Sequence, residues 1–311
     1  MSVQILTDDD VGRWLTPTRT REWMRAALKA HTFGELSAPA RADAQLGQRR
    51  LRLTAGQAHA PEGGWFGFRS YLAPGDGRVE DVTVVYDEER GTVSGIHVGS
   101  ALAPRRCGSV TAIATAALTA PEADRLGLVG TGRQAWHQLW ALADVRDWQE
   151  VRVHSRDATR RERFAQRARD ELGVPAVAVA HAREAVEGMP VVVLATHSST
   201  PVVQADWLAR GTYLATIGPK QVGHHEFGLD LLDRLGLAVT DSVDQVAGYS
   251  PPNILTTTPD PPCLLNLGEV LWRGLPEVDG IRGPGDLTGY FSVGLGGAEA
   301  YLLAQVLREA G

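Results

Sequence analysis

A glycine-rich turn at residues 126–135 carries the clearest chemical signal in this sequence. The segment LGLVGTGRQA runs from an apolar, strand-like pattern into G-x-G-x-x-A, and apolar residues at helical spacing follow it. In this context the first glycine permits a tight turn, the second lets a pyrophosphate approach the backbone, and the helix N-terminus offers free N–H groups. The sequence therefore predicts a dinucleotide site formed by Gly130, Thr131, Gly132, Arg133 and Gln134.

The end of the next apolar run indicates which dinucleotide binds. That run, 151–156, ends in Ser155 and Arg156, where an NAD-selective fold usually has an Asp or Glu for the ribose 2′-OH. A hydroxyl and a guanidinium would hold a 2′-phosphate by charge-assisted hydrogen bonds, whereas a carboxylate would repel it. The residues therefore favour NADPH over NADH. Two alternatives stay open, because Asp157 lies one residue further on and the following arginines could begin a solvated surface helix.

Composition and charge limit the class of protein. A chain of 311 residues has room for one large or two ordinary domains, and its formal charge of −6 gives no basic field for nucleic acid. The two cysteines lack metal-binding spacing and suit a reducing compartment, so we expect no metal site. The N-terminus lacks a secretory pattern, and no apolar run approaches the roughly 18 residues of a membrane span. We expect a cytoplasmic protein that binds neither membranes nor nucleic acid.

The elements that must position these residues follow from periodicity and turn signals. We expect a helix over 7–34, antiparallel strands over 50–98, a helix of small residues over 106–119, a loop over 250–262 and a closing helix over 295–309. Strands over 174–180, 190–196, 212–218 and 237–242 alternate with helical or loop segments, which is typical of a parallel doubly wound sheet. The predicted fold class is α/β. An N-terminal α+β domain over 1–113, completed by a C-terminal helix over 290–311, accompanies a Rossmann NAD(P)-binding domain over 114–289.

Several further stretches occur in a distinctive order along nearly the whole chain. They are GELSAPAR at 34–41, GSALAPRR at 99–106, ATHSSTPV at 195–202 and GYFSVG at 289–294. Together with the glycine-rich turn, their order and spacing resemble the ornithine cyclodeaminase/mu-crystallin family. Members of that family with known activity are NAD(P)-dependent enzymes that transfer a hydride at the α-carbon of an amino acid or its imine.

The resemblance assigns roles to particular residues. It implies that Arg41 and Arg106 hold the substrate carboxylate, although Arg105 beside Arg106 leaves that choice open and either could be a structural arginine. It also implies a homodimer formed by the N-terminal domain, which would serve substrate binding and dimerisation. On the cofactor side it adds Thr196, His197, Ser198 and Gly218.

Departures from the family pattern bear on the chemistry. Arg69 stands where the family usually has lysine, and Lys220 stands where cyclodeaminases have an aspartate that acts as a base. Cys107 replaces the usual threonine, and Glu299 the usual aspartate. An arginine can clamp a carboxylate but cannot act as a base, and a lysine cation would serve as an acid or electrostatic anchor. Arg69 as a solvated strand residue and Lys220 as a solvent-directed one remain alternatives.

These residues favour an NADPH-dependent reductase of an imino acid or cyclic imine, or the reverse amino-acid dehydrogenase, with Arg69 and Lys220 as catalytic residues. Three arginines around one site would favour an anionic, even dicarboxylic, substrate. One alternative is an ornithine-type cyclodeaminase with a non-standard base such as Glu226. The other is a non-catalytic NADP(H)-binding module, because both the lysine and the aspartate of the family are replaced.

Overall fold

The computed structural model describes residues 3–59, 63–73, 80–274 and 286–310, and it divides into two compact units. The first unit contains Met1–Arg106, Asp244–Gly248 and Gly294–Gly311, and the second contains Cys107–Val243 and Tyr249–Val293. The boundary falls within helix α3 (Leu102–Leu118). Two segments from late in the sequence therefore complete the first unit.

The first unit is built on a seven-stranded sheet of order β1-β7-β6-β5-β4-β2, with β3 paired to β4. Only the β1–β7 pair is parallel. Its strands are β1 (Gln4–Leu6), β2 (Leu36–Ser37), β3 (Ala42–Leu46), β4 (Arg49–Ala58), β5 (Trp65–Ala73), β6 (Asp81–Asp87) and β7 (Val93–Gly99). Its helices are α1 (Asp8–Gly12), α2 (Pro17–Thr32), most of α8 (Val243–Ala247) and α10 (Ala298–Ala310).

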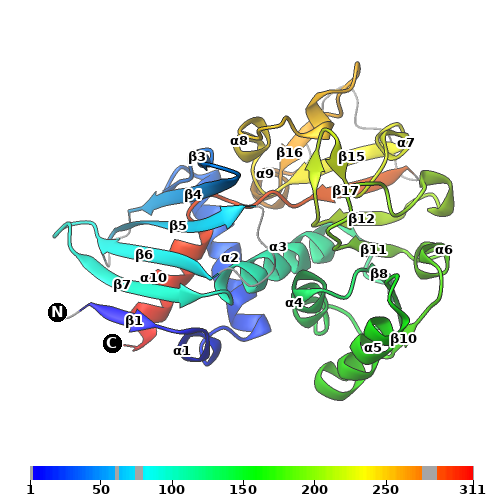
Figure 1. The fold of residues 1–311 in the computed structure, drawn as a ribbon, viewed down its shortest axis with the longest axis horizontal. Helices are drawn as coiled ribbons and strands as arrows, with labels where there is room; N and C mark the ends of the chain where they lie inside the picture. Colours follow the sequence, from blue (N-terminus) through cyan, green and yellow to red (C-terminus); the bar gives the residue numbers. More distant parts are fainter. Residues whose placement is uncertain (1–2, 60–62, 74–79, 275–285, 311) are drawn as a thin grey trace. The chain divides into compact units, whose positions relative to one another are not determined.

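Helix α10 covers one face of strands β4 to β7 (Figure 1). Two glycines make this close approach possible. A Cβ on Gly67 would lie 2.9 Å from the Ala300 methyl, and one on Gly95 would lie 2.7 Å from Leu307. The close packing therefore fixes the distance between α10 and β5. Glu299, which is described below, is one of the α10 residues positioned in this way.

The helix expected over 7–34 is two helices. The Thr16 hydroxyl accepts a hydrogen bond from the Arg19 N–H, and Pro17 occupies the first helical turn, so a new helix begins there. Thr7 and Asp10 form a capping box at the start of α1. The start of α1 agrees with the expectation, whereas the break before Thr16 was not expected.

The second unit contains a parallel sheet of order β10-β9-β8-β11-β12-β17-β15-β16. Its strands are β8 (Arg125–Val129), β9 (Glu150–His154), β10 (Ala176–Ala178), β11 (Val191–Leu194), β12 (Tyr213–Thr216), β15 (Leu235–Thr240), β16 (Leu264–Asn266) and β17 (Leu287–Phe291), and the hairpin β13 (Lys220–Gln221) and β14 (His224–His225) stands apart. Besides most of α3, its helical segments are α4 (Arg133–Leu142), α5 (Ala158–Leu172), α6 (Ala182–Val186), α7 (Leu229–Leu232), α9 (Leu267–Arg273) and the 3₁₀ turns η1 (Ala205–Trp207) and η2 (Ile254–Thr256). The expected α/β fold with a doubly wound parallel sheet is confirmed.

Six of these strands have the Rossmann order 3-2-1-4-5-6, with β8 as the first strand. Strands β11 and β12 are wholly buried, which explains why they read as unbroken apolar runs. The strand order reverses between β8 and β11, and ligands of such sheets bind beyond the carboxyl ends of the strands at this point. Strand β17, which was not expected from the sequence, lies beside β12 (Figure 1).

Among the described residues, no helix combines the length and the apolar character needed to cross a membrane.

Candidate functional site

The glycine-rich turn joins β8 to α4, and its two glycines, Gly130 and Gly132, differ in backbone conformation and surroundings. Gly130 has φ +125°, and a Cβ there would lie 2.3 Å from the Ala195 carbonyl oxygen, so the fold itself requires glycine. Gly132, the N-cap of α4, has φ −85°, and a Cβ there would meet nothing within 4 Å. As a glycine, the N-cap residue makes no side-chain cap hydrogen bond. The space above Gly132 and the N–H groups at the start of α4 fit the pyrophosphate of a dinucleotide.

The remaining residues expected at this turn lie around the same helix start. Thr131 and Gln134 are half-buried, and Arg133 is exposed in the first turn of α4. Ala135 is fully buried, and its methyl group would lie 3.6 Å from a Cβ on Gly130, so helix and turn are closely packed. The turn thus has the geometry that its sequence predicts.

Ser155 and Arg156 follow the carboxyl end of β9. The Ser155 hydroxyl donates to the Asp157 carbonyl at 3.1 Å, and Arg156 is exposed. The Asp157 carboxylate accepts the Arg160 N–H at 3.0 Å as the N-cap of α5, and it pairs with the Arg160 side chain at 3.4 Å. The Asp157 carboxylate therefore caps helix α5. Ser155 and Arg156 are the residues that follow the end of β9 directly.

A buried carboxylate joins the ends of β11 and β12. Glu226, which has no exposed surface, accepts from the Thr196 N–H (2.9 Å) and hydroxyl (2.8 Å) through Oε2. Through Oε1 it accepts from the N–H groups of Ile217 (3.1 Å) and Gly218 (2.6 Å). The Lys220 ammonium donates to the Gly218 carbonyl at 2.8 Å, and this lysine is 1% exposed. The idea that Lys220 points to solvent is wrong.

The surroundings of Glu226 also argue against its use as a base. Burial raises the pKa of its carboxyl, while the Lys220 cation and the N–H groups of Thr196 and Gly218 act in the opposite direction. Both of its oxygens already accept hydrogen bonds from the protein. A cyclodeaminase base must reach a substrate proton, whereas both oxygens of Glu226 bind groups of the protein itself.

The segment after Thr196 forms a tight, partly exposed turn. The Ser198 N–H donates to the Thr196 hydroxyl at 3.2 Å, and the Ser198 hydroxyl donates to the Thr200 carbonyl at 2.7 Å. His197 between them is exposed. Glu226 brings this turn beside Gly218, so Thr196, Ser198 and Gly218, which the resemblance assigns to the cofactor side, lie together at one edge of the sheet.

A second buried carboxylate, Asp241, organises the ends of β15 and β17. It accepts from the Val293 N–H at 2.7 Å and from the Ser292 hydroxyl at 3.4 Å. Cys107 lies with its sulfur 3.4 Å from the Ser292 hydroxyl. Sequence reasoning missed Asp241, although its place directly after the apolar run 235–240, at the carboxyl end of a strand, is a signal that could have identified it.

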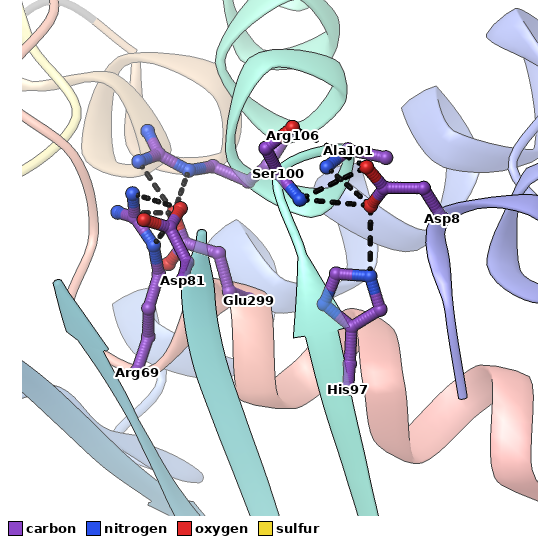
Figure 2. A network of polar contacts seen from close by, with 8 residues as sticks. All are labelled: Asp8, Arg69, Asp81, His97, Ser100, Ala101, Arg106 and Glu299. Carbon is purple, nitrogen blue, oxygen red and sulfur yellow. Dashed lines mark hydrogen bonds and ion pairs between the residues drawn. The ribbon is translucent and has the colours of Figure 1, made fainter. Parts of the chain in front are cut away.

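In the first unit, Arg69 and Arg106 meet at a shared carboxylate (Figure 2). Arg69 on β5 donates to Asp81 on β6 through Nε (2.9 Å) and Nη2 (2.6 Å), and its Nη1 lies 3.4 Å from Glu299 on α10. Arg106 on α3 donates to the same Glu299 oxygen through Nε (3.1 Å) and Nη2 (2.8 Å). We call these four residues the arginine–carboxylate cluster. All four side chains are at most 12% exposed, so Arg69 is not a solvated strand residue.

The charges of the arginine–carboxylate cluster balance, with two guanidinium groups and two carboxylates. Burial by itself would raise the pKa of the Glu299 carboxyl, but Arg106 and Arg69 outweigh it and hold that pKa below its ordinary value. Arg69 is thus compensated by Asp81 and Glu299, and it cannot be counted as a free positive charge for a substrate. Of the three arginines behind the expectation of a dicarboxylic substrate, Arg69 and Arg106 are therefore paired with buried carboxylates of the protein, whereas Arg41 is not part of the cluster.

Helix α3, which carries Arg106, is capped from a distant part of the chain. The Asp8 carboxylate accepts from the N–H groups of Ser100 and Ala101, both at 2.8 Å, and lies 3.0 Å from Nε2 of His97 (Figure 2). Burial lowers the pKa of His97, which is 1% exposed. This network fixes the start of α3. It thereby fixes the backbone position from which the Arg106 side chain extends.

The structure also distinguishes Arg105 from its neighbour. The Arg105 guanidinium lies 3.4 Å from where a Cβ on Gly12 would be, at the end of α1, whereas Arg106 enters the arginine–carboxylate cluster. Of the adjacent pair, Arg106 is the one placed beside Arg69.

Arg41 is held by a different element. Its backbone N–H and its Nε both donate to Oε1 of Gln245 on α8, at 3.1 and 3.2 Å. Gln245 is 1% exposed and donates in turn to the Pro39 carbonyl at 2.6 Å. Nothing in the local sequence around Gln245 indicates that it would position Arg41, because the two residues are 204 positions apart.

Comparisons with known proteins agree with this architecture. Residues 23–309 match the model of the ornithine cyclodeaminase/mu-crystallin family. A Δ1-pyrroline-2-carboxylate reductase of Bacillus cereus is 30% identical over 140 residues, which are 45% of this chain and 43% of that protein. The ketimine reductase mu-crystallin of Mus musculus is 25% identical over 156 residues, 50% of this chain and 49% of that one. The chain thus spans about half the length of the curated relatives it matches.

Solved structures share the fold over the whole chain. The Thermococcus litoralis Δ1-pyrroline-2-carboxylate reductase in complex with NADH and L-proline superposes with a TM-score of 0.84 at 21% identity, covering 99% of this chain and 97% of that one. An archaeal alanine dehydrogenase dimer with bound NAD gives a TM-score of 0.81 at 23% identity, covering 99% and 96%. The order of motifs in the sequence, the fold and the family match agree: this chain belongs to the ornithine cyclodeaminase/mu-crystallin family.

Proposed function

We propose that this protein is an NADPH-dependent oxidoreductase that transfers a hydride to the α-carbon of an imino acid or cyclic imine, or takes it from the corresponding amino acid. The observation that carries the proposal is the start of α4 at Gly132, a glycine N-cap with open space at its Cβ position, on a sheet of Rossmann order. The reductase names of the relatives support the reaction class.

Arg106, Arg69 and Lys220 would have different roles in this reaction. A bound nicotinamide would supply or accept the hydride. The Arg106 guanidinium has five N–H donors and binds Glu299 through Nε and Nη2, so the same planar group can also donate to a substrate carboxylate and fix the α-carbon. Arg69 orients the cluster. The Lys220 ammonium, held by the Gly218 carbonyl, suits an electrostatic anchor better than a mobile proton donor.

The proposed substrate carries a single carboxylate. Because Arg69 already donates to Asp81 and Glu299, Arg106 is the guanidinium of the arginine–carboxylate cluster that we assign to the substrate, and one planar guanidinium pairs with one carboxylate. An iminium is already cationic and needs little acid catalysis, so its reduction suits a site without an available base. A cyclic imino acid with one carboxylate combines both features.

The test follows the absorbance of reduced cofactor with a panel of imines. Δ1-Pyrroline-2-carboxylate and its six-membered homologue should oxidise NADPH, and iminosuccinate should do so at least about tenfold more slowly, a difference of about 1.4 kcal/mol. NADPH binding without oxidation by any imine would favour the non-catalytic module. A protein that binds no dinucleotide would contradict the proposal.

Arg156→Ala should weaken NADPH binding by about 30-fold, since a charge-assisted hydrogen bond to the 2′-phosphate contributes about 2 kcal/mol. NADH lacks this phosphate, so its dissociation constant should change less than about twofold. Titration of tryptophan fluorescence with each cofactor measures both constants. Arg160→Ala, which removes an exposed arginine already paired with Asp157, is the matched control. Equal losses for NADPH and NADH would argue against a 2′-phosphate site at Arg156.

We propose that two copies of the chain pair through the sheet face opposite α10. That face carries Phe66, which is 36% exposed and stacks on Tyr86 at 4.6 Å between ring centroids. It borders a cavity of about 440 Å³ lined largely by apolar side chains, including Leu53 and Phe68. The archaeal alanine dehydrogenase of the same fold is described as a dimer.

Phe66→Lys should therefore convert the dimer to a monomer, because a buried cation at the centre of an apolar interface is costly. Light scattering after size exclusion measures the mass. Val177→Lys, which changes an exposed apolar residue on β10, should leave the dimer intact. A Phe66→Lys protein that stays dimeric would place the interface elsewhere.

We propose the cytoplasm as the location. Cys107 and Cys263 are both free thiols, and Cys263 is exposed, which suits a reducing compartment. Subcellular fractionation of the source cells would test this.

A further inference from the structure

The four hydrogen bonds that Glu226 accepts are divided between its two carboxylate oxygens according to strand. Oε2 accepts from the N–H and hydroxyl of Thr196, which follows β11, and Oε1 accepts from the N–H groups of Ile217 and Gly218, which follow β12. The two strands are neighbours in parallel register, with Leu194 opposite Thr216. One carboxylate therefore couples the backbones that emerge from two adjacent strands, each through a different oxygen.

The coupling leaves little freedom at either strand end. A Cβ on Gly218 would lie 2.4 Å from Glu226 Oε2 and 2.4 Å from the Thr196 carbonyl oxygen, so the backbones approach as closely as glycine allows. The Lys220 ammonium holds the Gly218 carbonyl at 2.8 Å and supplies the charge that balances Glu226. Neither Glu226 nor Lys220 has more than 1% of its surface exposed.

The position of this pair in the sheet indicates what it supports. In a Rossmann sheet the dinucleotide lies across the carboxyl ends of the strands, with its pyrophosphate at the helix after the first strand and its adenosine ribose at the end of the second. Here those places are Gly132 after β8 and Ser155 after β9. The other half of the sheet, with the ends of β11 and β12, remains for the nicotinamide half.

We propose that Glu226, with Lys220, is a positioning residue for the nicotinamide half of the cofactor. It touches no ligand itself, and it acts by holding the Thr196–Ser198 turn and the Gly218 backbone in their binding arrangement. This inference rests on the proposed function, because it presumes that a dinucleotide binds. It gives the buried Glu226–Lys220 pair a role in cofactor affinity, in place of proton transfer.

The experiment compares the whole cofactor with its adenosine half. Glu226→Gln keeps the shape of the side chain, but its amide nitrogen cannot accept, so one strand end loses both of its acceptor contacts. The dissociation constant for NADPH should rise at least about tenfold, while that for 2′,5′-ADP changes less than about twofold. Glu171→Gln removes the same charge from an exposed carboxylate paired with Arg167, and it should change neither constant.

A second variant keeps the test decisive if Glu226→Gln does not fold, as judged by circular dichroism. Glu226→Asp retains the charge beside Lys220 but is one methylene shorter, so it cannot reach both strand ends. The same split between NADPH and 2′,5′-ADP is expected. Unchanged NADPH binding, or equal losses for both ligands, would overturn the proposal. A wild-type protein that binds neither ligand would instead refute the proposed function.

Discussion

Arg106→Met should lower kcat/KM for the imino-acid substrate by about 10³-fold, corresponding to about 4 kcal/mol. The variant removes the guanidinium that would hold the substrate carboxylate, and it leaves Glu299, which is 1% exposed, with only the 3.4 Å contact to Arg69 from the cluster's arginines. Breaking a buried pair in this way should also reduce the free energy of unfolding by about 3 kcal/mol. Steady-state kinetics and urea denaturation measure the two effects.

Arg106→Lys separates the two roles of this residue. A lysine keeps a positive charge beside Glu299, so the free energy of unfolding should fall by less than about 1 kcal/mol, whereas the paired geometry for a carboxylate is lost. We expect kcat/KM to fall by about 30-fold, mainly through KM, with no change in the dissociation constant for NADPH. Unimpaired turnover in both variants would show that Arg106 serves only to neutralise Glu299.

Gly132→Ala should weaken NADPH binding by at least about 30-fold, or about 2 kcal/mol, without destabilising the fold. The reason is that Gly132 has φ −85° and ψ −175°, which any residue adopts, and among the described residues a Cβ there meets nothing within 4 Å beyond its own local backbone. The added methyl group would instead occupy the space in which the pyrophosphate approaches the backbone. The free energy of unfolding should change by no more than about 0.5 kcal/mol.

Gly130→Ala is the matched comparison, two residues away in the same turn. Its φ of +125° disfavours any side chain, and the new Cβ would lie 2.3 Å from the Ala195 carbonyl oxygen. We expect a loss of more than about 2 kcal/mol in the free energy of unfolding. Thermal denaturation and fluorescence titration distinguish the two variants. If Gly132→Ala bound NADPH normally, the pyrophosphate could not lie at this turn.

The sequence predicted the dinucleotide turn because all of its determinants are contiguous. Strand, turn and helix start lie within one short stretch, 126–135, and each glycine acts on the backbone at its own position. The same reasoning explains why the parallel sheet was predictable: strands buried on both faces appear as apolar runs, which β11 and β12 show clearly. The family resemblance added the order of the remaining motifs, and the match over 23–309 confirms it.

The environment of the charged residues could not be derived in this way. Arg69 and Glu299 are 230 positions apart, and they meet only because α10 returns along the face of β5. Asp81 neutralises Arg69 because β5 and β6 pair in a register that places Arg69 opposite Thr83, two residues from Asp81. A sequence pattern specifies which side chains face inward, but not which of them meet.

The sequence by itself therefore determined the fold class, the family and the strand–turn–helix of residues 126–135, all of which depend on local backbone preference and on motif order. Only the tertiary structure decided that the arginine–carboxylate cluster is neutral, that Arg106 and not Arg105 enters it, and that Lys220 is buried against Gly218. The physical reason is that the energy of a charge depends on the groups around it in space, and strand register and chain return bring those groups from distant parts of the sequence.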